Sequence, residues 1–119
     1  MGYESKLFIV EKSELVDEEV GKRFAEVIAI YNASCFPAMA DKLRDAEKTD
    51  CCIYDGDEMI LKDKYGKELT EASIPFVIDI LEEELNKGED YRRIKPLMYM
   101  LKGFEMEKWR ELAVLHYGY

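Results

Sequence analysis

The sequence predicts a single α+β domain over residues 1–119, with a mainly antiparallel sheet of about five strands and three to four helices packed on one side. Three features predict this class. Two apolar, β-branched segments lie within the first 32 residues, two segments with helical spacing of apolar residues lie between residues 73 and 102, and an apolar run ends the chain. Because 48% of the 119 residues are apolar and no linker-like composition interrupts them, one core is expected.

The first two strands are predicted as an antiparallel hairpin with a long loop. Residues 6–12 alternate apolar side chains on both faces, which indicates a strand. Residues 13–22 are polar and acidic and end near Gly21, so we expect a connection there. Residues 23–32 are β-branched and aromatic, with Glu26 as the one acid, which is typical of an interior strand.

The middle of the chain predicts a helix and a second hairpin. Ser34 is a candidate N-cap for a helix over residues 37–48. Residues 51–54 and 57–62 flank Asp55-Gly56, a dipeptide that suits the positive φ angles of a tight hairpin turn. Residues 64–67 predict a further turn.

Two helices and a strand are predicted for the last third. The first helix begins at Thr70 or Ser73, since Pro75 suits a first helical turn, and it ends at Gly88.

The second helix covers about residues 91–102 and ends at Gly103. Pro96 conflicts with an early start and favours a beginning nearer Arg93, because proline cannot donate and clashes one turn back. A helical turn over 105–110 and a covered strand over 112–117 complete the chain.

The cysteines and the histidine do not form a recognisable catalytic or metal motif. Cys35, Cys51 and Cys52 are an odd set with one adjacent pair, which favours reduced cysteines over a secreted disulfide framework. His116 is the one histidine, and no local pattern supplies a nucleophile or an orienting group, although a cysteine could meet it in space.

Metal binding is not predicted either. Adjacent cysteines in a strand point to opposite faces and do not fit a zinc motif. The contiguous acids of residues 55–58 indicate a solvated turn rather than a spaced calcium loop. We therefore expect no catalytic residue, no cofactor and no metal. The chain also shows no signal peptide and no apolar run long enough to span a bilayer, so a cytoplasmic location is expected.

Charge is the most informative feature. The net charge is −9, with −12 over residues 1–90 and +3 over residues 91–119, which argues against a nucleic-acid-coating role. The acids either keep the protein soluble or form a face that docks on a basic partner. The residues predicted for such a face are Asp17, Glu18, Glu19, Asp55, Asp57, Glu58, Glu82, Glu83 and Glu84.

The C-terminal segment is the candidate for other kinds of binding. Its aromatic and basic side chains are the types that anchor interfaces, although amphipathic packing explains them equally well: Tyr91, Arg92, Arg93, Trp109 and Arg110. An anionic small molecule would need Arg92, Arg93, Lys95 or Arg110, with a pocket at a homodimer seam.

Five segments carry a resemblance to known sequences. Residues 2–10, 24–29 and 114–119, together with 91–93 and 102–104, resemble small uncharacterised proteins of phages, prophages and mobile elements of Gram-positive bacteria. The resemblance implies a phage setting but no active-site residue. Together with the charge, it implies an accessory protein that inhibits a host defence.

The leading hypothesis is therefore a non-enzymatic, anti-CRISPR-like or anti-restriction protein in the cytoplasm of an infected bacterium. Its expected partner is a host defence protein with a basic nucleic-acid-binding surface, without direct contact to nucleic acid or membrane, and the chain itself is a possible homodimer. The alternatives are a protein that sequesters a nucleotide signal and a metal-dependent enzyme with unassigned carboxylates.

Overall fold

The computed structural model describes residues 5–32, 37–88, 91–106 and 111–118, which contain six strands and three helices. In chain order these are β1 (Ser5–Asp17), β2 (Lys22–Asn32), α1 (Pro37–Arg44), β3 (Cys51–Asp55), β4 (Glu58–Ile60), β5 (Thr70–Ala72), α2 (Ile74–Asn86), α3 (Tyr91–Glu105) and β6 (Leu112–Gly118).

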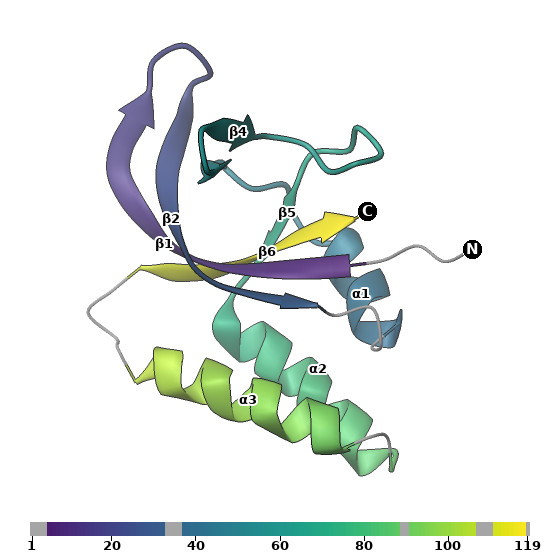
Figure 1. The fold of residues 1–119 in the computed structure, drawn as a ribbon. Helices are drawn as coiled ribbons and strands as arrows, with labels where there is room; N and C mark the ends of the chain where they lie inside the picture. Colours follow the sequence, from purple (N-terminus) through teal and green to yellow (C-terminus); the bar gives the residue numbers. More distant parts are fainter. Residues whose placement is uncertain (1–4, 33–36, 89–90, 107–110, 119) are drawn as a thin grey trace.

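The strands form one mixed sheet in the order β4-β3-β2-β1-β6-β5 (Figure 1). Every neighbouring pair is antiparallel except β2 and β3, which run parallel and join only through Arg23 with Cys51 and Phe24 with Cys52. The expected α+β class is confirmed, and the sheet has one strand more than the approximate number predicted because the short β5 pairs with β6.

Both faces of the sheet are covered. Leu7 and Ile9 of β1 pack with apolar side chains from all three helices. Phe8 and Val10 point to the other face and form a second cluster with side chains of β2, β3 and β6. The helices therefore lie on one side of the sheet, as predicted, and the alternation of β1 leaves it apolar on both faces.

A β-bulge in β2 changes which side chains face the helices. Ile9 pairs with Ala29, but the next residue, Val10, pairs with Val27, so Ile28 is an extra residue on β2. Ala29 therefore packs on the helix side, whereas Val27 packs on the opposite cluster. The bulge places both side chains against a core although they have the same parity in the sequence.

The first hairpin differs from its prediction. A loop was expected over residues 13–22. Residues 13–17 instead continue β1, and the loop covers only residues 18–21. The Asp17 side-chain Oδ1 accepts hydrogen bonds from the backbone N–H groups of Glu19 (2.9 Å) and Val20 (3.3 Å), and Gly21 has a φ of +69°. These contacts tighten the turn and let polar residues continue the strand pairing.

The second hairpin is confirmed, with its turn shifted by one residue. Asp55 pairs with Glu58, so Gly56 and Asp57 are the two central residues. Gly56 has a φ of +64° and Asp57 does not have a positive φ, which is the pattern of a type II′ turn. The turn expected near residues 64–67 is also present, with Gly66 at a φ of +78°.

The start and end of α2 follow the sequence signals. The Ser73 hydroxyl accepts a hydrogen bond from the Phe76 N–H (3.2 Å), and Gly88 follows the helix with a φ of +80°. The alternative start at Thr70 is wrong, because Thr70 belongs to β5 and pairs with His116.

The other two helices end differently from their predictions. α1 stops at Arg44 instead of residue 48, because residues 47–49 hydrogen-bond to the β5 region. α3 runs from Tyr91 through Pro96 to Glu105 without ending at Gly103. Its apolar stripe is buried against α2 and the sheet, and that packing offsets the hydrogen bond that proline cannot make. Ser34 and residues 107–110 of the helical turn predicted over 105–110 lie outside the described residues. Within the described ranges, no helix combines the length and apolar character that a membrane crossing requires.

Candidate functional site

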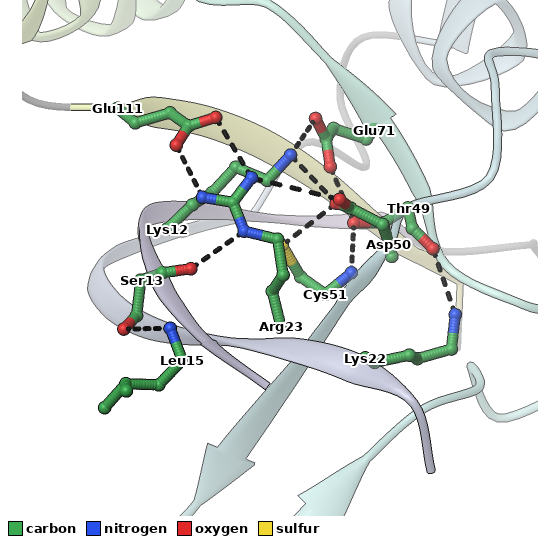
Figure 2. A network of polar contacts seen from close by, with 10 residues as sticks. All are labelled: Lys12, Ser13, Leu15, Lys22, Arg23, Thr49, Asp50, Cys51, Glu71 and Glu111. Atoms are coloured by element: carbon green, nitrogen blue, oxygen red, sulfur yellow. Dashed lines mark hydrogen bonds and ion pairs between the residues drawn. The ribbon is translucent and has the colours of Figure 1, made fainter. Parts of the chain in front are cut away.

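Figure 2 shows a network of polar contacts that includes Lys12 and Arg23. The Lys12 ammonium lies 2.9 Å from Oδ1 of Asp50 and 2.8 Å from Oε2 of Glu71. The other oxygen of Glu71 accepts a hydrogen bond from the Thr49 hydroxyl (2.7 Å). Lys12 therefore connects β1 to the segment before β3 and to β5.

Arg23 extends this network along the sheet. Its guanidinium donates two hydrogen bonds to the carboxylate of Glu111 (3.1 and 2.5 Å), and its Nε donates to the carbonyl of Ser13 (2.8 Å). At this point β1 and β2 separate, because Lys12 pairs with Ala25 but the next paired residue of β1 is Val16. Arg23 thus satisfies a carbonyl where the strand ladder is irregular.

Electrostatics keep the network charged. Burial lowers the pKa of Lys12, but hydrogen bonds to Glu71 and Asp50 outweigh burial and raise this pKa to about 12. The hydrogen bond from Lys12 lowers the pKa of Asp50, and that from Arg23 lowers the pKa of Glu111. These groups are therefore ion-paired at neutral pH, and Lys12 does not have the low pKa of a general base or an amine nucleophile.

The same cluster contains the one group of potential metal ligands found among the described residues. One atom each of Asp50, Cys51 and Glu71 lies within 4.8 Å of the others. Lys12, however, already binds both carboxylates. Burial raises the pKa of Cys51 to about 11, which disfavours the thiolate form that a metal would bind. These side chains fit a structural ion-pair network better than a metal site.

The structure separates His116 from Cys51. His116 lies in β6, where its Nε2 is 2.9 Å from the Ser5 hydroxyl, and burial lowers its pKa. Cys51 packs in the cluster on the helix-free face, whereas two neighbours of His116 belong to the helix-side cluster: Leu7, its pairing partner in β1, and Val114, two residues before it in β6. Burial also raises the pKa of Cys52. Both described cysteines are therefore protonated at neutral pH, and Cys35 lies outside the described residues.

The tip of the first hairpin is the most exposed apolar part of the sheet. Leu15, Val16 and Val20 retain 71%, 49% and 37% of their accessible surface. In Figure 1 this hairpin projects from the end of the molecule opposite α2 and α3. The exposed acids Glu18 and Glu19 lie in its loop, and neither makes an ion pair with a described residue. The tip thus combines apolar surface with uncompensated negative charge.

The second hairpin lies beside the first. Phe24 of β2 and Tyr54 of β3 stack with ring centroids 6.2 Å apart and an interplanar angle of 21°. Asp57 and Glu58 of the adjoining turn are exposed and make no ion pair with described residues, while the side chain of Asp55 lies outside the description. We call this combined region the hairpin end, defined as residues 14–21 and 56–58 together with Phe24 and Tyr54.

The three remaining predicted acids lie elsewhere and have lysine partners. Glu82, Glu83 and Glu84 belong to α2, away from the hairpin end in Figure 1. Their carboxylates are 3.6, 3.0 and 3.6 Å from the ammonium groups of Lys102, Lys42 and Lys87, respectively. The nine predicted acids therefore do not share one face, because the α2 group is both distant and compensated.

Other sequence candidates find less support in the geometry. Arg92, Arg93 and Lys95 are exposed on α3, whereas Arg110 and Trp109 lie outside the described residues. A cavity of about 610 Å³ at the β1–β2 separation is lined by four glutamates and one lysine, which is unfavourable for a nucleotide phosphate.

The apolar tip and the Lys12 network were not predicted from the sequence. For the apolar tip, the sequence signal was the apolar pair Leu15-Val16 within an acidic stretch. The Lys12 network brings together residues that lie up to 99 positions apart in the sequence. Comparisons with family models, curated proteins and solved structures found no match.

Proposed function

We propose that this chain is a non-enzymatic protein that binds another protein through its hairpin end. The proposed partner handles nucleic acid and presents a basic binding surface, which the bound chain covers and so inhibits. In the setting implied by the resemblance to phage proteins, the partner is a host defence protein of the anti-CRISPR or anti-restriction target type, met in the cytoplasm of an infected bacterium.

The observation that carries this proposal is the composition of the tip. Glu18 and Glu19 carry uncompensated charge beside the exposed side chains of Leu15 and Val16. Acids alone would serve solubility, and an apolar tip alone would favour aggregation. The combination favours a protein partner, because an apolar contact desolvates the centre of an interface while surrounding charges steer and orient the encounter.

The rest of the molecule supports a rigid presentation of this tip. Lys12 and Arg23 tie β1 and β2 to the residue before β3, to β5 and to the residue before β6, just before the hairpin leaves the sheet. Fixing the base of a projecting hairpin lowers the ordering cost on binding. The network thus acts in the proposal as a support for the interface and not as a reaction centre.

The test compares two variants with the same change in net charge. Glu18→Gln/Glu19→Gln alters the hairpin end, and Glu82→Gln/Glu83→Gln alters the paired acids of α2. Each purified protein is immobilised and exposed to nuclease-treated lysate of a Gram-positive bacterium at low and high salt. A recovered protein is then purified and assayed for nucleic-acid binding with and without the chain.

We expect the wild type and the α2 variant to capture the same nucleic-acid-binding protein and to displace its nucleic acid. The hairpin-end variant should bind at least about tenfold more weakly, since the loss of two favourable charge contacts of about 1 kcal/mol each reduces affinity to that extent. Equal binding by both variants, or a partner that keeps its nucleic acid when bound, would contradict the proposal.

A further inference from the structure

The stacked rings of Phe24 and Tyr54 form an aromatic surface beside the acidic tip. Tyr54 keeps 42% of its accessible surface despite stacking on Phe24. The pair joins β2 to β3 where these strands have only two paired positions. The ring of Tyr54 is exposed, and its hydroxyl makes no hydrogen bond with a described residue, so this aromatic surface is available to a partner.

Carboxylates lie close to this aromatic surface. Asp17 pairs with Lys22, which lies two residues before Phe24 on β2, so the side chains of Asp17 and Phe24 lie on the same face of the sheet, and Glu19 follows in the adjoining loop. The Oδ1 atom of Asp17 accepts both backbone hydrogen bonds of the turn, which leaves its Oδ2 atom for a ligand. Glu19 has no ion-pair partner among the described residues.

A hollow adjoins the other side of the pair. Phe24 is part of the wall of the cavity of about 610 Å³, together with Glu14 and Glu26. A group that enters beside Phe24 therefore meets an aromatic ring and carboxylates from both β1 and β2. Such surroundings attract a cation that has a flat, weakly hydrated face.

We propose that the Phe24–Tyr54 pair is a subsite for an arginine side chain of the partner, with Asp17 and Glu19 as the carboxylates that receive its guanidinium. This inference rests on the proposed function and names the chemistry that the hairpin end recognises. Arginine fits better than lysine, because its planar guanidinium stacks on a ring and donates hydrogen bonds in a fork, whereas an ammonium is compact and strongly hydrated. A nucleobase could also stack here, but its phosphates would face the acids of the tip.

The test uses nine-residue peptides of arginine alone and of lysine alone, which have equal formal charge. Binding of each fluorescent peptide is measured by anisotropy for the wild type, Tyr54→Leu and Tyr54→Phe. Tyr99→Leu is the matched control, because Tyr99 is an exposed tyrosine on α3, away from the hairpin end. Circular dichroism and thermal unfolding establish that each variant is folded.

We expect the wild type to bind the arginine peptide about 3- to 10-fold more tightly than the lysine peptide, the range that a partly exposed cation–aromatic contact supplies. Tyr54→Leu should remove this preference, while Tyr54→Phe and Tyr99→Leu should keep it. If Tyr54→Leu is unfolded, ring resonances of Phe24 and Tyr54 in the wild type provide a second measurement, and they should shift on addition of the arginine peptide.

The outcomes separate this inference from the proposed function. Equal binding of the two peptides, with affinity that depends on Glu18 and Glu19, would overturn the arginine subsite and leave the acidic interface in place. An arginine preference that survives Tyr54→Leu, or ring resonances that do not move, would likewise overturn it. Failure of both peptides to bind would contradict the electrostatic basis of the proposed function itself.

Discussion

Two runs of three acids have opposite surroundings in this molecule. Asp17-Glu18-Glu19 turns the first hairpin, where the side chain of Asp17 holds the loop and Glu18 and Glu19 face solvent without a described ion-pair partner. Glu82-Glu83-Glu84 lies on α2, where each carboxylate has a lysine within 4 Å. The two runs are almost identical in sequence, yet one is an uncompensated surface and the other is part of an ion-paired helix.

The difference teaches that local charge density is a poor guide to surface potential. The lysines beside α2 come from three places in the chain, α1, α3 and the residue after α2 itself. The loop of the first hairpin projects away from α2 and α3 (Figure 1). Its acids Glu18 and Glu19 have no lysine partner among the described residues. Tertiary structure therefore decides which acids remain available for a partner.

The largest expected effect tests whether the two ends also differ in their contribution to stability. Leu81 of α2 is fully buried in the core between the helices and the sheet. Leu81→Ala should reduce the free energy of unfolding by about 2–5 kcal/mol, because it removes packed methyl groups and leaves a cavity. Urea unfolding followed by circular dichroism measures this change.

The matched change at the hairpin end is Leu15→Ala, since Leu15 is 71% exposed. It should alter the free energy of unfolding by no more than about 0.5 kcal/mol. A comparable loss in both variants would mean that the tip is part of the folding core, and the contrast between the ends would then fail.

A smaller effect is expected from the ion pairs. The side chain of Lys12 is 9% exposed and binds Asp50 and Glu71, whereas Lys102 and Glu82 are each about half exposed. Lys12→Met should cost about 1–3 kcal/mol, because the partly buried carboxylate of Glu71 loses its counterion, while solvent screens the exposed carboxylate of Asp50. Lys102→Met should cost less than about 1 kcal/mol, since solvent screens this pair.

Thermal and urea unfolding of the two lysine variants should thus rank them clearly. If Lys12→Met were as stable as the wild type, the network would not be the support that holds the base of the hairpin. The proposed function would then lose its account of how the tip is fixed.

The smallest effect concerns acid. The pKa values of Asp50 and Glu111 lie below their ordinary values of 3.8 and 4.5 because of hydrogen bonds from Lys12 and Arg23. A lowered pKa in the folded state stabilises it above the ordinary pKa, and this contribution is lost as the pH falls through the folded-state value. The free energy of unfolding of the wild type should therefore decline as the pH falls below 4.5.

Asp50→Asn should make this decline shallower, and unfolding midpoints measured across the acid range would reveal it. Asp57→Asn is the control, because Asp57 is exposed and has no ion-pair partner among the described residues. An identical acid dependence in the wild type and Asp50→Asn would show that the Lys12–Asp50 pair does not contribute.

Much of the fold was predictable because its signals are local. Ser73 and Gly88 bound α2 as capping chemistry requires, and Gly56 allows the type II′ turn of the second hairpin. The extension of β1 to Asp17 was missed, since polar residues beyond the core give no apolar alternation. β5 was missed because a strand of three residues depends on its pairing with β6 rather than on its own composition.

The candidate site was less predictable than the fold. The sequence predicts the acids of the hairpin end but does not separate them from those of α2, because the lysines that pair with α2 come close only on folding. The stacking of Phe24 on Tyr54 joins two segments through the parallel pairing of β2 with β3, whereas the sequence favoured antiparallel hairpins throughout. Contacts between distant segments were the missing information in both cases.

The extra residue at position 28 affects how sequences of this kind should be aligned. Before it, odd-numbered side chains of β2 such as Ala25 contact one hydrophobic layer, and after it, odd-numbered side chains such as Tyr31 contact the other. A deletion of Ile28 would make Val27 and Ala29 consecutive, so that they pair with Val10 and Ile9 in a regular ladder and keep their present faces, whereas a one-residue deletion elsewhere in β2 would exchange inside and outside for one part of the strand. An alignment gap at position 28 would therefore signal loss of the bulge with the same two packed faces, and a gap at another position of β2 would signal rearranged packing.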